Sequence, residues 1–394
     1  MNETIYMPVG EVCSSISDTY REKKNMVTLI NTSDVLEGRV LNHERVPNSN
    51  LKGQFKKTFQ RDDILYSEIR PQNRRFAYVD FSPIDYIAST KLMVIRAKKD
   101  VVSPKYLYYF LKNSSTVAEL QLLAETRSGT FPQITFSEVA NLTIPVPPLA
   151  VQEVIVQTMQ CLEDKTICNE QINDNLQQQA QAIYHERYES ISPIALPSGW
   201  RIVTLGEVAT ISNKAFNPLK ETERTLEHYS IPAFDEARFP IFEPSTSIKS
   251  NKFIIDASCF MISKLNPTTK RVWKPYCLTE NAVCSTEFIV YKAKDKSITD
   301  FLFSVIDSSS FSDFMCSHVT GSTGSRQRTT PSDTLSYELI LPSEEELTEF
   351  QALVAPMYAQ MRINAIENDK LKRLRDSLLP KLMSGEIDVS DIQL

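Results

Sequence analysis

The segment Ser67-Glu68-Ile69-Arg70-Pro71 returns 196 residues later as Ser263-Lys264-Leu265-Asn266-Pro267. Other segments recur at a spacing of 195 or 196: residues 9–12 as 205–208, residues 89–94 as 285–290, Gly129 as Gly324 and Pro147 as Pro342. A unit of this length is too long for a solenoid repeat, so each copy should be a complete domain with a connecting element. An approximate two-fold axis should relate the copies, and a bipartite ligand would match them.

The composition is that of an ordinary globular protein, with 42% hydrophobic and 23% charged residues. The length of 394 exceeds what one core usually supports, so we expect two or more domains. No stretch approaches the roughly 18 to 20 apolar residues that span a bilayer, and residues 1–6 show no basic start followed by an apolar run, so we expect a cytoplasmic protein. The seven cysteines form no C-x-x-C pair and the four histidines lack metal-ligand spacing, so we expect free thiols and no metal site.

The net charge of −6 conceals two basic windows at equivalent places in the copies. The first contains Arg70, Arg74 and Arg75 without an acid, and the second contains Lys264, Lys270, Arg271 and Lys274, also without an acid. Local potential governs phosphate attraction within a Debye length of roughly 8 to 10 Å. These windows therefore suit phosphate anchoring in spite of the acidic average.

Each copy reads as a mixed α/β domain followed by a long helix. Apolar, β-branched runs predict strands at 63–67 and 91–96, with counterparts at 259–263 and 287–292. Short buried helices are expected at 104–111 and 299–306, and strands that end in proline at 142–148 and 339–342.

Two long helices are expected, at about 149–189 and about 344–383, because apolar residues recur every seven positions. The predicted seam residues are Ile155, Leu162, Asn169, Leu176 and Ile183 on the first helix, and Phe350, Met357, Asn364, Leu371 and Leu378 on the second. Asn169 and Asn364 are equivalent, and they either restrict the register inside the seam or point to solvent. Pro356 should kink or restart the second helix.

Connectivity predicts the arrangement of these parts. A helix of 40 residues is about 60 Å long, so the first helix carries the chain away from the first domain to the second, and a second helix packed on it must run back antiparallel. The expected fold class is α+β, with two similar domains in inverted orientation, separated by two antiparallel coiled-coil helices and related by pseudo-two-fold symmetry. The predicted parts are a domain at 1–148, a helix at 149–190, a domain at 191–343, a helix at 344–385 and a tail at 386–394.

The sequence lacks the motifs that common enzymes need. It contains no G-x-x-x-x-G-K-[ST], no G-x-G-x-x-G, no H-E-x-x-H and no Asn-Pro-Pro-Tyr type tetrapeptide of an amino-methyltransferase. With only nine glycines, it also has few positions where backbone amides could approach a nucleotide. We therefore expect no catalytic residue.

Several segments resemble specificity subunits of type I restriction-modification systems. The similarity is carried by Leu196-Pro197-Ser198-Gly199-Trp200-Arg201 with residues 205–208, by Leu265-Asn266-Pro267, by the loop at 320–324, and by residues 374–385 at the end of the second helix. The first copy departs from the pattern, since Trp200 aligns with Thr4. The resemblance covers essentially the whole chain.

The resemblance implies a non-catalytic subunit in which each target recognition domain reads one half of a split, asymmetric DNA site and the helix pair sets the gap. It also implies two methyltransferase subunits as partners and, optionally, two restriction subunits. No cofactor is implied for this chain, whereas S-adenosylmethionine, ATP and Mg would serve the partners. Two alternatives remain open: a self-sufficient methyltransferase or nuclease with a divergent site, and a coiled-coil scaffold that does not bind DNA.

Residues that would contact bases are proposed from their chemistry. The loop at 127–133 aligns with the loop at 322–328, and arginine and glutamine can form paired hydrogen bonds with guanine and adenine. The base-reading candidates are Gln133, Arg326, Gln327 and Arg328, and the predicted DNA-binding set also includes Arg127, Phe131 and Asn266. Ordinary solvated loop residues are the alternative. Phe76 and Trp273 either flank DNA or are buried.

Overall fold

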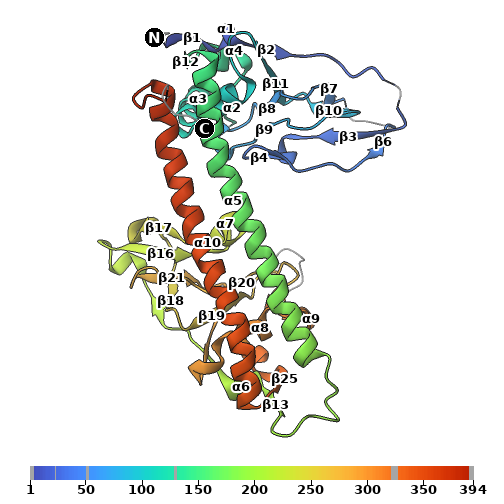
Figure 1. Cartoon of the computed structure of the whole chain (residues 1–394), viewed down its shortest axis with the longest axis vertical. Helices are drawn as coiled ribbons and strands as arrows, with labels where there is room; N and C mark the ends of the chain where they lie inside the picture. The colour runs from blue at the N-terminus through green and yellow to red at the C-terminus, as the bar shows by residue number, and fades with distance from the viewer. Residues whose placement is uncertain (1–3, 23, 50–52, 128–130, 321–326, 390–394) are drawn as a thin grey trace. The chain divides into compact units, whose positions relative to one another are not determined.

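The computed structural model describes residues 4–22, 24–49, 53–127, 131–320 and 327–389. The chain divides into two compact units, one formed by residues 1–165 with 371–394 and the other by residues 166–370 (Figure 1). Each long helix contributes to both units. The units are described separately below, each with the helix segments that belong to it.

The first unit contains two four-stranded sheets. Strand β1 (Ile5–Pro8) pairs with β12 (Thr143–Val146) outside them. The first sheet has the order β2 (Cys13–Ile16), β11 (Leu92–Ala97), β8 (Ile64–Ser67), β9 (Phe76–Tyr78). The second has the order β6 (Val46–Pro47), β3 (Met26–Ile30), β10 (Tyr86–Ser89), β7 (Phe55–Lys57). The helices are α1 (Val9–Val12), α2 (Pro104–Lys112), α3 (Ser114–Arg127) and α4 (Phe136–Asn141).

The second unit repeats this plan. Strand β13 (Arg201–Thr204) pairs with β25 (Glu338–Leu341). One sheet has the order β14 (Ala209–Ile211), β22 (Phe288–Ala293), β19 (Cys259–Ser263), β20 (Val272–Trp273), and a five-stranded sheet has the order β15 (Ala215–Phe216), β18 (Lys252–Ile254), β21 (Ala282–Ser285), β16 (Thr225–Tyr229), β17 (Ile241–Pro244). A short pair joins β23 (Val319–Thr320) to β24 (Arg328–Thr329), and the helices are α6 (Leu205–Val208), α7 (Ile231–Ala237), α8 (Thr299–Ile306) and α9 (Ser309–Ser317).

Strand register is the same in both copies. Leu92 lies opposite Ser67 between β11 and β8, and the equivalent Phe288 lies opposite Ser263 between β22 and β19. Along β8, Ile64 and Tyr66 enter one apolar core while Leu65 enters another, because successive side chains of a strand point to opposite faces. Both faces of this sheet are covered, which explains why its strands read as continuous apolar runs. The predicted strands and short helices are confirmed.

The two long helices are α5 (Leu149–Tyr184), continued by a short π-helical turn at His185–Glu189, and α10 (Glu344–Ser384). All ten predicted seam residues are buried or half-buried. In the first unit Ile155 shares a core with Leu382 and Glu163 pairs with Arg375. In the second unit Tyr184 contacts Phe350 and Asn169 bonds Asn368. The segments therefore run antiparallel within each unit. Helix α10 continues through Pro356 without a restart, because a proline removes only one backbone hydrogen bond and the flanking Val354 and Tyr358 are buried.

A polar layer crosses the helix pair in the second unit. Asn169 Nδ2 donates to Asn368 Oδ1 at 2.8 Å and to Glu367 Oε2 at 2.7 Å, and Asn364 Nδ2 donates to Asn173 Oδ1 at 2.8 Å. The pairs Asn169–Asn368 and Asn364–Asn173 exchange places under the 195-residue repeat. Asn169 is 1% and Asn364 is 4% exposed, so both lie inside the seam and neither points to solvent. Sliding one helix would break both pairs, and the layer therefore restricts the register.

Candidate nucleic-acid interface

The segments at 67–71 and 263–267 form the same backbone scaffold in both copies. Ser67 Oγ accepts from the Ile69 amide at 3.0 Å, and Ser263 Oγ accepts from the Leu265 amide at 3.2 Å. The Arg70 amide donates to the Pro132 carbonyl and the Asn266 amide to the Gln327 carbonyl, at 3.1 and 2.9 Å. The scaffold thus holds the base of each loop that was predicted to read DNA.

Arg70 and Asn266 both adopt the left-handed backbone conformation, with φ of 44° and 48°. This conformation is uncommon for residues other than glycine, and a following proline normally favours an extended backbone at the preceding position. Each such residue costs on the order of 1–3 kcal/mol and persists only where its surroundings impose it. The same strained position is therefore built twice by the same hydrogen bonds.

The side chains beside the scaffold differ between the copies, and their charges are reversed. In the first copy Lys91 Nζ lies 3.4 Å from Glu68 Oε2 and donates to Gln133 Oε1 at 3.1 Å. The equivalent positions of the second copy hold Glu287, Lys264 and Arg328. Both donors of the Arg328 fork bind Glu287 at 3.0 Å, and these bonds lower the pKa of the Glu287 carboxyl below its ordinary value.

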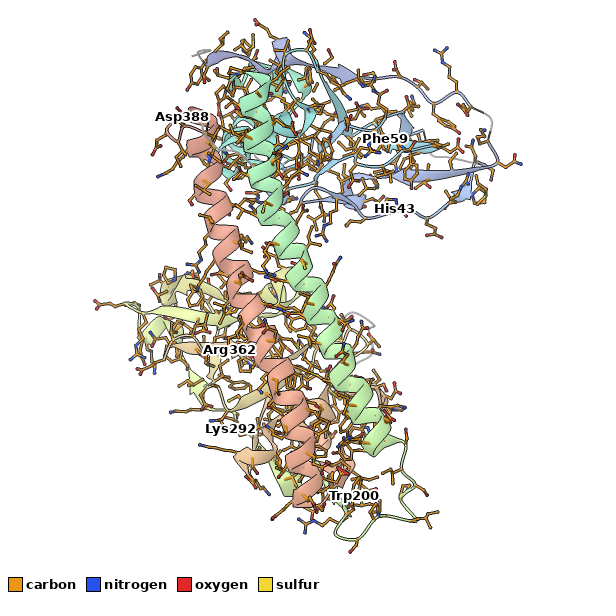
Figure 2. The ribbon with its side chains drawn as sticks, in the orientation of Figure 1. His43, Phe59, Trp200, Lys292, Arg362 and Asp388 are labelled. Carbon is orange, nitrogen blue, oxygen red and sulfur yellow. The ribbon has the colours of Figure 1, made fainter. Side chains whose placement is uncertain are left out.

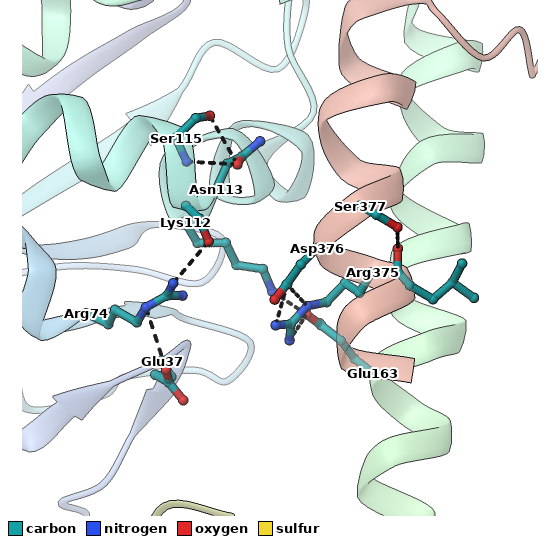
Figure 3. Close-up of polar contacts among 11 residues, drawn as sticks. Glu37, Arg74, Lys112, Asn113, Ser115, Glu163, Arg375, Asp376 and Ser377 are labelled. Atoms are coloured by element: carbon teal, nitrogen blue, oxygen red, sulfur yellow. Dashed lines mark hydrogen bonds and ion pairs between the residues drawn. The ribbon is translucent and has the colours of Figure 1, made fainter. Parts of the chain in front are cut away.

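In the first copy most of the predicted DNA contacts have partners within the protein. Arg74 pairs with Glu37, as Figure 3 shows, and also donates to the Ser114 hydroxyl. Arg75 donates to the carbonyls of Ser33 and Val35. Arg127 pairs with Glu138 at 2.6 Å. Phe131 is 49% exposed, and Arg70 is exposed with no ion pair among the described residues.

In the second copy three of the predicted phosphate contacts are ion-paired. Lys270 Nζ lies 2.9 Å from Asp307 Oδ1, Arg271 forms a two-pronged pair with Asp235, and Lys274 pairs with Asp300. Lys264 and Gln327 are half-buried, and Arg326 lies outside the described residues, as do Gly129 and Gly324 at the predicted loop centres. Phe76 and Trp273, at 2% and 3% exposed, are core residues, so the idea that they flank DNA is wrong.

The lysine pairs of the second unit attach the domain to its helices. Gln351 of α10 donates to Asp300 Oδ2 at 2.9 Å, and Gln177 of α5 donates to Asp307 Oδ2 at 2.9 Å. Arg362, labelled in Figure 2, donates from α10 to the carbonyl of Tyr276 at 3.2 Å. Lys270 and Lys274 thus belong to a polar junction between domain and helix pair.

The first unit has a corresponding junction around Glu163 of α5. Lys112 and Arg375 both approach the Glu163 carboxylate, as Figure 3 shows, and Tyr109 donates to it at 2.9 Å. Burial lowers the pKa of the Lys112 ammonium, and the Glu163 charge opposes that effect. Sequence reasoning missed Glu163 and Asp300, because nothing in the chain distinguishes them from solvated acids. It also missed Asn173 and Asn368, although an Asn-x-x-x-Asn pattern on both helices would have revealed them.

Other kinds of site find little support in the described part of the chain. Those residues contain no group of three His, Cys, Asp or Glu side chains that could hold a metal ion. A cavity of 580 Å³ lies between Trp200 and the helix residues Ile183 and Leu353, and one of 500 Å³ lies between Phe59 and Ile84. Neither is lined by the scaffold. Among the described helices, none has the length and apolar character needed to cross a membrane.

The chain is similar in sequence to known proteins. Residues 6–178 match the family model of the type I restriction modification DNA specificity domain. The chain is 29% identical to the type I restriction enzyme HindI specificity subunit of Haemophilus influenzae, over 92% of this chain and 94% of that protein. It is 24% identical to the MjaIX specificity subunit of Methanocaldococcus jannaschii, over 79% and 77% respectively.

Solved structures share the fold. One is the S subunit of a type I restriction-modification system from M. genitalium, with a TM-score of 0.53 and 15% identity over 99% of this chain and 97% of that chain. Another comes from a study of complex assembly and conformational transition of the type I R-M system, with a TM-score of 0.51 and 18% identity over 98% of each chain. The first half of the chain thus matches the type I specificity domain, and most of the chain is similar to specificity subunits of type I restriction enzymes.

Proposed function

We propose that each domain of this chain recognises one half of a split DNA sequence and that the two halves differ. The observation that carries the proposal is the duplicated scaffold. Its backbone bonds are the same in both copies, whereas the side chains beside it differ in size and charge. Arg70, Glu68 and Lys91 of the first copy correspond to Asn266, Lys264 and Glu287 of the second. Equal scaffolds with unequal side chains favour an asymmetric bipartite target.

The helix pair would set the distance between the two halves. The asparagine layer supports this role, because two buried reciprocal hydrogen-bonded pairs oppose sliding of α5 along α10. The predicted inversion of the two domains stays part of this proposal. Under it, the pseudo-two-fold repeat presents equivalent surfaces to two equal partners.

We further propose that the partners are DNA, two methyltransferase subunits and, optionally, two restriction subunits. S-adenosylmethionine, ATP and Mg would serve those partners, and this chain would hold no cofactor. The similarity to specificity subunits of two type I restriction enzymes supports a role as a subunit of such a complex. Because its target is cellular DNA, a cytoplasmic location is part of the proposal.

The experiment compares methylation with and without the chain. A methyltransferase subunit would be expressed alone or together with this chain, and methylated adenines would be mapped across the host genome. We expect a split motif with a fixed gap only when the chain is present. Methylation of the same motif by the partner alone would contradict the proposal, and cleavage or methylation by the purified chain alone would favour the enzyme alternative.

The alternative of a coiled-coil protein that does not bind DNA predicts a different result. Salt titration of purified full-length chain on double-stranded DNA should show affinity that falls steeply as salt rises, because phosphate contacts release counterions. If neither the chain alone nor the chain with its methyltransferase partner shows salt-dependent binding, the coiled-coil protein that does not bind DNA is favoured.

A further inference from the structure

We propose that Arg70 and Asn266 are the specificity-determining pair of this chain, Arg70 reading a guanine in one half-site and Asn266 an adenine in the other. The inference rests on the proposed function and names residues for it. Arg70 and Asn266 occupy equivalent positions in the two copies. They are 196 positions apart, precede Pro71 and Pro267, and share the left-handed backbone conformation.

The surrounding bonds impose that conformation on both residues. The Ile134 amide donates to the Glu68 carbonyl at 2.9 Å and the Thr329 amide to the Lys264 carbonyl at 3.1 Å, so the returning segment of each loop holds the scaffold on one side. On the other side the carbonyls of Arg70 and Asn266 accept from the amides of Asn73 and Thr269, both at 2.8 Å. A strained position that is clamped from both sides and repeated in both copies is typical of a functional site.

Intramolecular pairing favours Arg70 over most of the other predicted cations. Seven of the other cations predicted to contact DNA have an intramolecular partner: Arg74, Arg75, Arg127, Lys270, Arg271, Lys274 and Arg328. Arg70 is exposed, and the described residues offer it no ion pair. Its guanidinium can therefore present two parallel donors to O6 and N7 of guanine without breaking an existing bond.

Asn266 carries a complementary signal. Its Oδ1 is buried and has no hydrogen-bond partner among the described residues. An unpaired buried acceptor is unfavourable, and rotation of the amide toward a base would relieve it. The amide then accepts from N6 and donates to N7 of adenine, the pairing that suits asparagine. The left-handed backbone aims both side chains from the same point of the scaffold.

The test uses the full-length chain and the split duplex that selection from random DNA identifies for it. Competition binding would measure the preference at every base pair for the wild type, Arg70→Asn and Asn266→Arg. We expect Arg70→Asn to lose roughly 5- to 150-fold discrimination for guanine at one position of one half-site and to gain preference for adenine there. Asn266→Arg should do the converse in the other half-site.

Two controls separate the side chain from the fold. Arg70→Gly should lose the guanine preference while melting at or above the wild-type temperature, because glycine adopts the left-handed conformation without strain. Arg61→Asn removes an exposed arginine of the same unit, away from the scaffold, and should leave the base preferences unchanged. Unchanged preferences in Arg70→Asn and Arg70→Gly, with two selected half-sites in the wild type, would overturn this inference and leave the proposed function standing. No half-sites in the wild type would overturn both.

Discussion

Ile155 and Phe350 occupy equivalent positions in the two copies and are both fully buried, yet they build different cores. Ile155 belongs to a core that also contains Met159 and Leu382. Phe350 packs edge-on against Tyr188 and Phe301, with ring centroids 5.3 and 5.9 Å apart. The two copies thus share the backbone fold but differ in the side chains that fill the core. The same division holds at the scaffold, where backbone bonds agree and side chains differ.

The largest effect is expected from emptying the aromatic core. Phe350→Ala should lower the free energy of unfolding of the second unit by about 3–5 kcal/mol, because it leaves a cavity among rigid rings. Both tryptophans, Trp200 and Trp273, lie in that unit, so their fluorescence in a urea titration reports it selectively. Ile363→Ala, at a position that is 57% exposed, is the control and should change stability by less than about 0.5 kcal/mol. Equal effects of the two variants would contradict the packing described.

A buried ion pair distinguishes the first copy. Arg96 binds both oxygens of the fully buried Asp63 at 2.7 and 2.8 Å, whereas the second copy has Cys259 at the position of Asp63. Asp63→Ala should destabilise the first unit by about 2–3 kcal/mol, since it leaves the Arg96 donors unpaired. Hydrogen exchange of the β8 and β11 amides measures the change. Lys292→Ala, which removes a more exposed pair with Asp256, should cost no more than about 1 kcal/mol, and a larger cost than that of Asp63→Ala would refute the comparison.

The asparagine layer should behave symmetrically, because the repeat exchanges its two pairs. Asn169→Ala and Asn364→Ala should each destabilise the second unit by about 1–2 kcal/mol by leaving buried amide groups unpaired. Tryptophan fluorescence during urea unfolding again reports the change, and Glu170→Ala, at an exposed neighbouring position, is the matched control. Two variants as stable as the control would show that the layer does not restrict the register.

The smallest effect concerns the reversed charges beside the scaffold. Glu287→Lys places three cations together and should lower the melting temperature of the second unit, whereas the triple change Lys264→Glu, Glu287→Lys, Arg328→Gln reproduces the first copy and should restore most of it. In the wild type the folded-state pKa of Glu287 is below its ordinary value of 4.5, so its contribution is present above that pH and is lost as the pH falls through the lower folded value. Glu287→Gln should therefore flatten the acid side of the stability profile. An unchanged acid slope would count against the pair.

Much of the fold could be predicted from the sequence, because the strands at 63–67 and 259–263 and the seam of the long helices depend on local apolar periodicity. The repeat identified the copies and their equivalent positions. The sequence could not predict which charged residues lack a partner inside the protein. Lys270 and Lys274 were predicted to contact phosphates, but they pair with Asp307 and Asp300, which lie more than 25 residues away in sequence. Nor does periodicity reveal a left-handed φ at Arg70, since long-range hydrogen bonds impose it.

The most direct test of the central claim is selection of the full-length chain, with its methyltransferase partner, on random double-stranded DNA followed by sequencing. If each domain recognises its own half-site, the selected DNA should contain two short and different sequence blocks. A gap of fixed length with no base preference should separate them. A single contiguous block, two identical blocks or a gap of variable length would contradict the account.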